Sequence, residues 1–89
     1  MISIKTSKLE IDDNLRKKIE IICSFNNLKP KFINGTIRNI DKTNLSYIEP
    51  HRVIIDNINY LLFNEHNYFY IGSLSNKYAI SDFRKIIGN

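Results

Sequence analysis

The chain has 89 residues, 43% of them hydrophobic and 25% charged, and its net charge is +4. This length and composition describe one globular domain, residues 1–89, with a single modest core, and they exclude a disordered chain. No apolar run approaches the roughly 20 residues that span a bilayer, and the first residues lack the apolar segment of a signal peptide. We therefore expect a cytoplasmic protein without a membrane partner.

The positive charge is unevenly placed along the chain. Residues 1–45 hold nine Lys and Arg against five Asp and Glu, whereas residues 46–89 hold four of each kind. An excess of this size is typical of a solvated surface, and it also suits a partner that carries phosphates or acidic side chains.

A short strand and one amphipathic helix are predicted before residue 30. Apolar and polar residues alternate from Ile2 to Thr6, which indicates the strand. Asp12 and Asp13 are suited to cap a helix, and apolar residues then recur at helical spacing, at Leu15, Ile19, Ile22 and Cys23. We expect a helix over residues 13–25 that packs its apolar face on a sheet, with Cys23 as a small buried hydrophobe.

Residues 31–38 are predicted to form a hairpin. Asn34-Gly35 lies there between β-favouring residues. The pair Asn-Gly is a strong signal for a type I′ turn, because such a turn needs positive φ at both central positions. A polar loop over residues 41–44 then leads into the most aromatic part of the chain.

Residues 46–71 hold the longest apolar runs of the chain. Pro50 cannot donate to a ladder, so a strand that includes it must carry it at its start or on a sheet edge. Three runs of β-favouring residues follow, joined by polar turns at Asp56-Asn57 and at residues 64–67. These runs, at residues 52–55, 58–63 and 68–71, predict an antiparallel meander.

The chain is predicted to close with a short strand at residues 78–80 and a helical turn that Gly88 stops. With so many short strands in sequence, few residues remain to cover both faces of an open sheet. The elements together predict an α+β fold, in which one amphipathic helix packs on a strongly curved antiparallel sheet or a small SH3-like barrel of about five strands.

The sequence contains no pattern that predicts catalysis. His51 and His66 lie apart without a carboxylate cluster, so we interpret each as a polar surface residue and predict no metal site. Glu49 is expected to form an ion pair with Arg52. The serines lack activating neighbours, and three glycines make no phosphate loop. We therefore expect a protein that is not an enzyme and holds no cofactor.

Aromatic and basic residues of the predicted strands match those that bind single-stranded nucleic acid, because bases stack on aromatic rings and cations meet phosphates. The alternative is that the tyrosines pack at the rim of the core while Phe63 and Phe69 fill it. His51 beside Arg52 is also suited to grip a phosphate. The predicted nucleic-acid-binding residues are Arg38, His51, Arg52, Tyr60, Tyr68, Tyr70 and Lys77.

Three segments of the chain resemble the WYL domain family. Tyr47–Val53, Asn59–Phe63 and Tyr78–Phe83 are similar to that family's Pro-containing strand, Trp-Tyr-Leu strand and closing Phe-Arg-Leu-x-Arg-Ile segment. The resemblance covers roughly residues 15–86, with Asn59 in place of the Trp and with Ala79 and Asp82 in place of two basic residues. It implies an SH3-like or Sm-like barrel and a sensor domain that binds nucleic acid or a nucleotide ligand.

Four classes of function stay open. The first is a regulatory domain that binds nucleic acid or a nucleotide, and the second is a phage or mobile-element protein that inhibits a host complex such as a CRISPR or other defence nuclease. A RelE-like ribonuclease toxin is third, although residues 68–80 hold one basic residue, Lys77, where such toxins have Arg-rich strands. The fourth is a structural subunit that forms a homodimer or larger oligomer through a free strand edge, at Pro50 or at Ile4.

Overall fold

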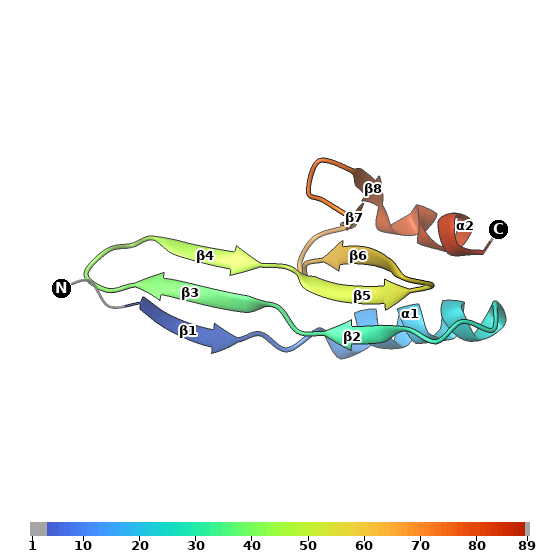
Figure 1. The fold of residues 1–89 in the computed structure, drawn as a ribbon, viewed down its shortest axis with the longest axis horizontal. Helices are drawn as coiled ribbons and strands as arrows, with labels where there is room; N and C mark the ends of the chain where they lie inside the picture. Colours follow the sequence, from blue (N-terminus) through green and yellow to red (C-terminus); the bar gives the residue numbers. More distant parts are fainter. Residues whose placement is uncertain (1–3, 89) are drawn as a thin grey trace.

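The computed structural model describes residues 4–88, which form an elongated α+β molecule of 51 × 22 × 22 Å (Figure 1). The predicted strand at residues 2–6 lies partly outside the described residues. The elements in chain order are β1 (Ile4–Lys8), α1 (Asp13–Phe25), β2 (Lys31–Ile33), β3 (Thr36–Ile40), β4 (Ser46–Glu49), β5 (His51–Ile55), β6 (Ile58–Leu62), β7 (Tyr68–Ile71), β8 (Lys77–Ala79), the 3-10 turn η1 (Ile80–Asp82) and α2 (Phe83–Ile87).

The strands form two antiparallel sheets. One sheet has three strands in the order β1-β3-β4, and the other has five in the order β2-β5-β6-β7-β8. The α+β class and the meander of β5, β6 and β7 are confirmed. The sheets are not closed into a barrel, so the predicted SH3-like barrel is wrong, and a second short helix, α2, follows the last strand.

One long hairpin connects the two sheets. Ile33 pairs with Arg52 in the five-stranded sheet, and Thr36 pairs with Glu49 in the three-stranded sheet. Each strand advances by three residues between these two pairs, so the register is the same on both sides of the break. Because side chains alternate between faces, the two sheets are successive parts of one ribbon, as Figure 1 shows.

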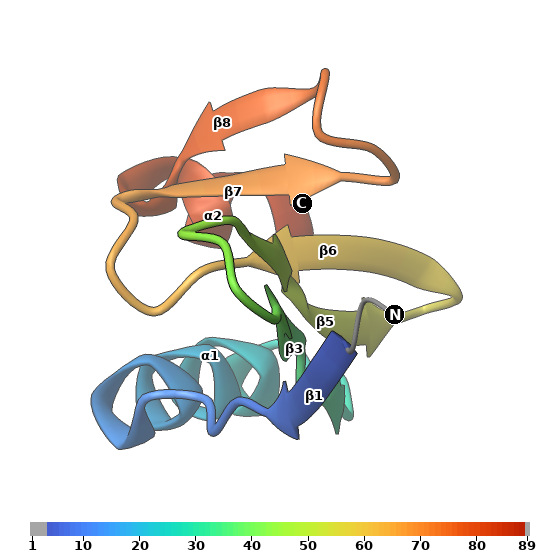
Figure 2. The same ribbon diagram turned by 90° about the vertical axis from the view of Figure 1, so that its left-hand side faces the viewer.

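The outer part of this ribbon, with β1 added beside β3, is called the arm below. The other five strands and the two helices are called the body. In Figure 2 the arm projects toward the viewer, while α1 and α2 lie beside the sheet of the body. Every residue of β1 and of β4 is exposed, so no layer of the protein covers either of these strands.

The core lies between the helices and one face of the body sheet. Asp12 caps the N-terminus of α1, because its carboxylate accepts a hydrogen bond from the Leu15 N–H at 3.1 Å. The predicted range of the helix, residues 13–25, is confirmed. Cys23 is fully buried, as predicted, and burial raises the pKa of its thiol. The buried apolar residues are Ile11, Ile19, Cys23, Val53, Ile55, Tyr60, Leu62, Phe69 and Phe83.

The hairpin predicted at Asn34-Gly35 is wrong. The chain runs straight on from β2 into β3 there, and neither residue has a positive φ. Positive φ at two successive residues occurs instead at Asp56 and Asn57, with φ of 51° and 65°, between β5 and β6. That is the conformation of a type I′ turn, so the tight turn of the meander is built from Asp-Asn.

Gly35 is needed for a close approach of two strands. A Cβ at this position would overlap the carbonyl oxygen of Glu49 and lie 2.8 Å from the carbonyl carbon of Pro50. Pro50 has no N–H to donate to the strand pairing, and the backbone N–H and C=O of Gly35 form hydrogen bonds with other residues. The Gly35 N–H donates to His51 Nδ1 at 2.9 Å, and its carbonyl accepts from the Leu9 N–H at 2.8 Å. Gly35, Pro50 and His51 are called the joint below.

Gly35→Ala is expected to destabilise the protein by about 1–3 kcal/mol or more, because overpacking forces the two strands apart. The measurement is urea unfolding followed by circular dichroism. Gly72→Asn is the matched control, since Gly72 has a φ of 74°, which Asn tolerates, and nothing lies near its absent Cβ. Equal stability of Gly35→Ala and the wild type would contradict the close approach at the joint.

Candidate nucleic-acid interface

The face of the body sheet that points away from the helices is a candidate binding surface. Val53, Tyr60 and Phe69 pack on the helix side, where they join residues of α1 and α2 in the core. Their neighbours along each strand therefore lie on the opposite side. This side, called the open face, consists of ten strand residues: Lys31, Ile33, Arg52, Ile54, Asn59, Leu61, Tyr68, Tyr70, Lys77 and Ala79.

Five residues of the open face form one cross-strand row. Each pairs directly with the next, so the row crosses all five strands, in the order Ile33, Arg52, Leu61, Tyr70 and Lys77. Neighbouring strands lie about 4.8 Å apart. Arg52 and Lys77 are three strand spacings apart, or roughly 14 Å, and an apolar residue and a tyrosine lie between them.

The open face is positively charged. Lys31, Arg52 and Lys77 are exposed, and none of the ten described strand residues on this face is acidic. α1, on the other side of the sheet, carries charges of both signs, because it contains the acidic residues Asp13 and Glu20 as well as basic residues. The open face is therefore the side of the body sheet that best suits a polyanion.

Two tyrosines provide aromatic surface on the open face. Tyr68 is exposed, and the Lys77 Nζ lies 3.9 Å from the centroid of its ring, which is a cation–π contact. Tyr70 is half-buried and meets the ring of Phe63 edge-on at a centroid distance of 6.2 Å. A ring packed on one side and open on the other is suited to stack against a base.

The sequence-predicted residues separate into three groups in the structure. Arg52, Tyr68, Tyr70 and Lys77 come together on the open face. Arg38 lies on the arm, where its guanidinium pairs with the Glu49 carboxylate at 2.9 Å. Glu49 was expected to pair with Arg52, but Arg38 is its partner because the two residues lie on neighbouring strands.

His51 and Tyr60 are buried, at 2% and 3% exposure. Tyr60 belongs to the core, where its ring lies 5.4 Å from that of Phe83. His51 was predicted as a surface residue, and the structure corrects this. Its imidazole accepts the Gly35 N–H, a partner that local sequence does not reveal. Neither side chain can reach a ligand on the open face.

The residues that sequence reasoning missed are Lys31 and Leu61. Leu61 was treated as part of an apolar run, and Lys31 as part of a separate hairpin. The signal for both is the alternation of side chains along a strand, which assigns them to a face once the pairing of β2 with β5 and of β5 with β6 is known.

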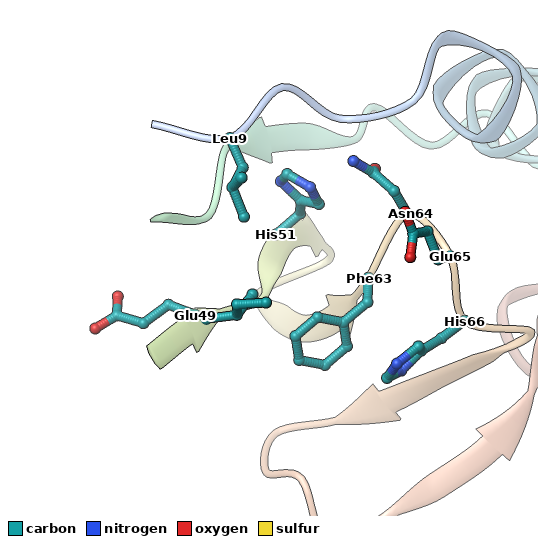
Figure 3. A pocket seen from close by; sticks show the side chains of 8 residues that line it. Leu9, Glu49, His51, Phe63, Asn64, Glu65 and His66 are labelled. Atoms are coloured by element: carbon teal, nitrogen blue, oxygen red, sulfur yellow. The ribbon is translucent and has the colours of Figure 1, made fainter. Parts of the chain in front are cut away.

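A pocket of about 200 Å³ lies where the arm meets the body (Figure 3). The ring centroids of Phe63 and His66 lie 4.7 Å apart on one wall of the pocket. The Glu49 carboxylate points away from the cavity. Asn64 holds the adjacent loop, because its side chain donates to the Glu10 carbonyl and accepts from the Asp12 N–H, both at 2.8 Å. The pocket is lined by Leu9, Ile48, Glu49, His51, Phe63, Asn64, Glu65 and His66.

Residues 4–88 contain no group of three or more His, Cys, Asp or Glu side chains placed to hold a metal ion. None of the helices in that range is long and apolar enough to cross a membrane. A comparison with protein-family models, curated proteins and solved structures finds no match for this chain. The resemblance to WYL domains therefore stays a prediction.

The buried imidazole is expected to make stability depend on pH. Burial lowers the pKa of His51 from its ordinary value of 6.5, although Asn64 and Glu10 beside it act in the opposite direction. The unfolded chain then binds more protons than the folded protein as pH falls through 6.5, so the free energy of unfolding decreases there and keeps decreasing to the lower pKa of the folded state.

Urea unfolding between pH 7.5 and pH 5.5 measures this effect. In His51→Asn the amide oxygen is able to replace Nδ1 as the acceptor for Gly35 without titrating, so the decrease in stability should become smaller. His66→Asn, at an exposed position, is the matched control for the replacement of a histidine by asparagine. An unchanged pH dependence in His51→Asn would contradict the assignment.

Proposed function

We propose that the protein is a small non-enzymatic regulatory domain that binds single-stranded nucleic acid through the open face. The observation that supports this most is the cross-strand row in which Arg52 and Lys77 flank Leu61 and Tyr70. Proteins that bind single strands combine a positive surface for phosphates with aromatic rings on which bases stack. The open face has both, and both lie on regular strands, which hold their side chains in fixed positions.

The row suggests how a single strand lies on the sheet. A strand that crosses the β-strands at a steep angle is able to place phosphates near Arg52 and Lys77 and a base against Tyr70. Tyr68, which lies beside Lys77, offers a second ring for the next base. Stacking and phosphate contacts do not distinguish bases strongly, so binding should be tolerant of sequence.

The resemblance to WYL domains supports the same class of partner, since that family is described as sensing nucleic acids or nucleotides. Asn59, which stands in place of the family's Trp, lies on the open face opposite Ile54. Stacking in this protein is therefore assigned to Tyr68 and Tyr70, both in β7, one strand away from that position.

A fluorescence-anisotropy titration with labelled single-stranded DNA and RNA at two salt concentrations tests the proposal. Binding should weaken as salt rises, because phosphate contacts release counterions. Arg52→Ala and Lys77→Ala should each lower the affinity and reduce the slope of log K against log salt by about 0.7. Lys17→Ala, on the exposed side of α1, changes the net charge equally and should leave the slope unchanged.

Tyr70→Leu tests the stacking contribution separately. Leucine keeps an apolar side chain against Phe63 but removes the aromatic face. The binding free energy should therefore weaken by roughly 1–3 kcal/mol, which is a loss of affinity of about 5- to 150-fold, while the slope of log K against log salt stays unchanged. If the wild type binds neither DNA nor RNA at low salt, the proposal is wrong. Binding to a host protein complex would then take its place as the function to test.

A further inference from the structure

The arm has two outer strands, and they differ in how their free edges are protected. Among residues 4–88, β1 and β4 each pair with β3 alone, so both leave one edge of backbone N–H and C=O groups open. Strand edges are commonly protected by lysine, which discourages pairing with another chain. β1 carries Lys5 and Lys8, whereas β4 has no basic residue.

Apolar side chains gather at the unprotected edge. Leu45, Tyr47 and Ile48 are 58%, 59% and 52% exposed, and all three lie in β4 or directly before it. The charge of β4 is also compensated within the chain, since Glu49 pairs with Arg38. An open strand edge with exposed apolar residues and a neutralised charge is suited to pair with another strand.

We propose that β4 pairs with β4 of a second copy of this chain, antiparallel and around a twofold axis, to form one six-stranded sheet from two arms. The free edge is short, because β5 continues from β4 and carries β6 on the same side. An added strand must therefore turn away after about four residues. β4 of a second copy meets this condition, because the turn at residues 41–45 leads straight back into β3.

The antiparallel arrangement also separates like charges. It places the Glu49 residues of the two chains at opposite ends of the paired segment, whereas a parallel arrangement would place them side by side. Directly opposed residues of a sheet share a face. A twofold axis perpendicular to the sheet keeps each face on its own side, so it must relate Tyr47 to Tyr47 of the second copy, or Ile48 to Ile48.

The foot of each arm lies beside the tip of the other arm in this arrangement. When the two β4 strands overlap, the tip of each arm reaches the body of the other copy. With Tyr47 opposite Tyr47 of the second copy, Leu45 at the tip of one arm lies opposite Glu49 of the other, at the rim of the pocket. The tip of each arm and the foot of the other therefore meet twice in the dimer, and this contact does not depend on nucleic-acid binding.

Sedimentation equilibrium of the wild type and two variants tests the dimer. The wild type should show twice the 10.5 kDa mass of the chain, with dissociation on dilution. Tyr47→Lys places one ammonium group of each chain at the twofold axis or one residue from it and should raise the dissociation constant at least 10-fold. Ile4→Lys, at a similarly exposed site on β1, should leave it unchanged. A single-chain mass at every concentration, or equal effects of both variants, would overturn the proposal.

Disulfide formation identifies the edge without relying on affinity. Opposed Cα atoms of an antiparallel pair lie about 4.5–5.5 Å apart, within the range that a disulfide spans. Oxidation of Tyr47→Cys or of Ile48→Cys should therefore give a covalent dimer, and Cys23 is buried and does not interfere. Ile4→Cys is the control. Cross-linking through Ile4→Cys alone, or through none of the three, would overturn pairing at β4.

Discussion

The arrangement of the whole chain depends on the close approach of two backbones at Gly35 and Pro50. Because Gly35 has no side chain, the Glu49 carbonyl is able to lie close to it. Because Pro50 has no N–H, the backbone hydrogen bonds between the two strands are interrupted at that point. His51 and Leu9 then bond to the backbone groups of Gly35, so no buried polar group of this glycine is left without a partner. Without this joint, the long hairpin could not pass from a covered sheet into an uncovered one.

The two parts of the ribbon are stabilised differently. The body buries an apolar core between its sheet and both helices, which is the largest favourable contribution to folding. The arm has no covered face, so it is held by its backbone ladder and by its attachment to the body. A three-stranded sheet with both faces in water is marginal by itself. This difference makes the arm the part of the protein that gains most from a partner.

Features set by neighbouring residues were predictable from sequence, and those set by distant contacts were not. The helix over residues 13–25, the turn at Asp56-Asn57 and the meander follow from local spacing and turn chemistry, and all are confirmed. Asn34-Gly35 looked like a turn because the sequence does not show that the glycine is needed for strand contact. In the candidate site, alternation along strands brought Arg52, Tyr70 and Lys77 together, whereas the burial of His51 and Tyr60 depends on packing from other elements.

The unbroken register of the long hairpin limits how this protein is able to change in evolution. An inserted or deleted residue between Ile33 and Thr36 would move every side chain of β3 to the opposite face of the arm. The loop at residues 41–45 carries no such constraint, because it lies beyond the last pair of the ladder. Among descendants of this sequence, the arm should therefore change in length by equal numbers of residues added to or removed from β3 and β4 at its tip. The spacing between Ile33 and Thr36 should stay fixed.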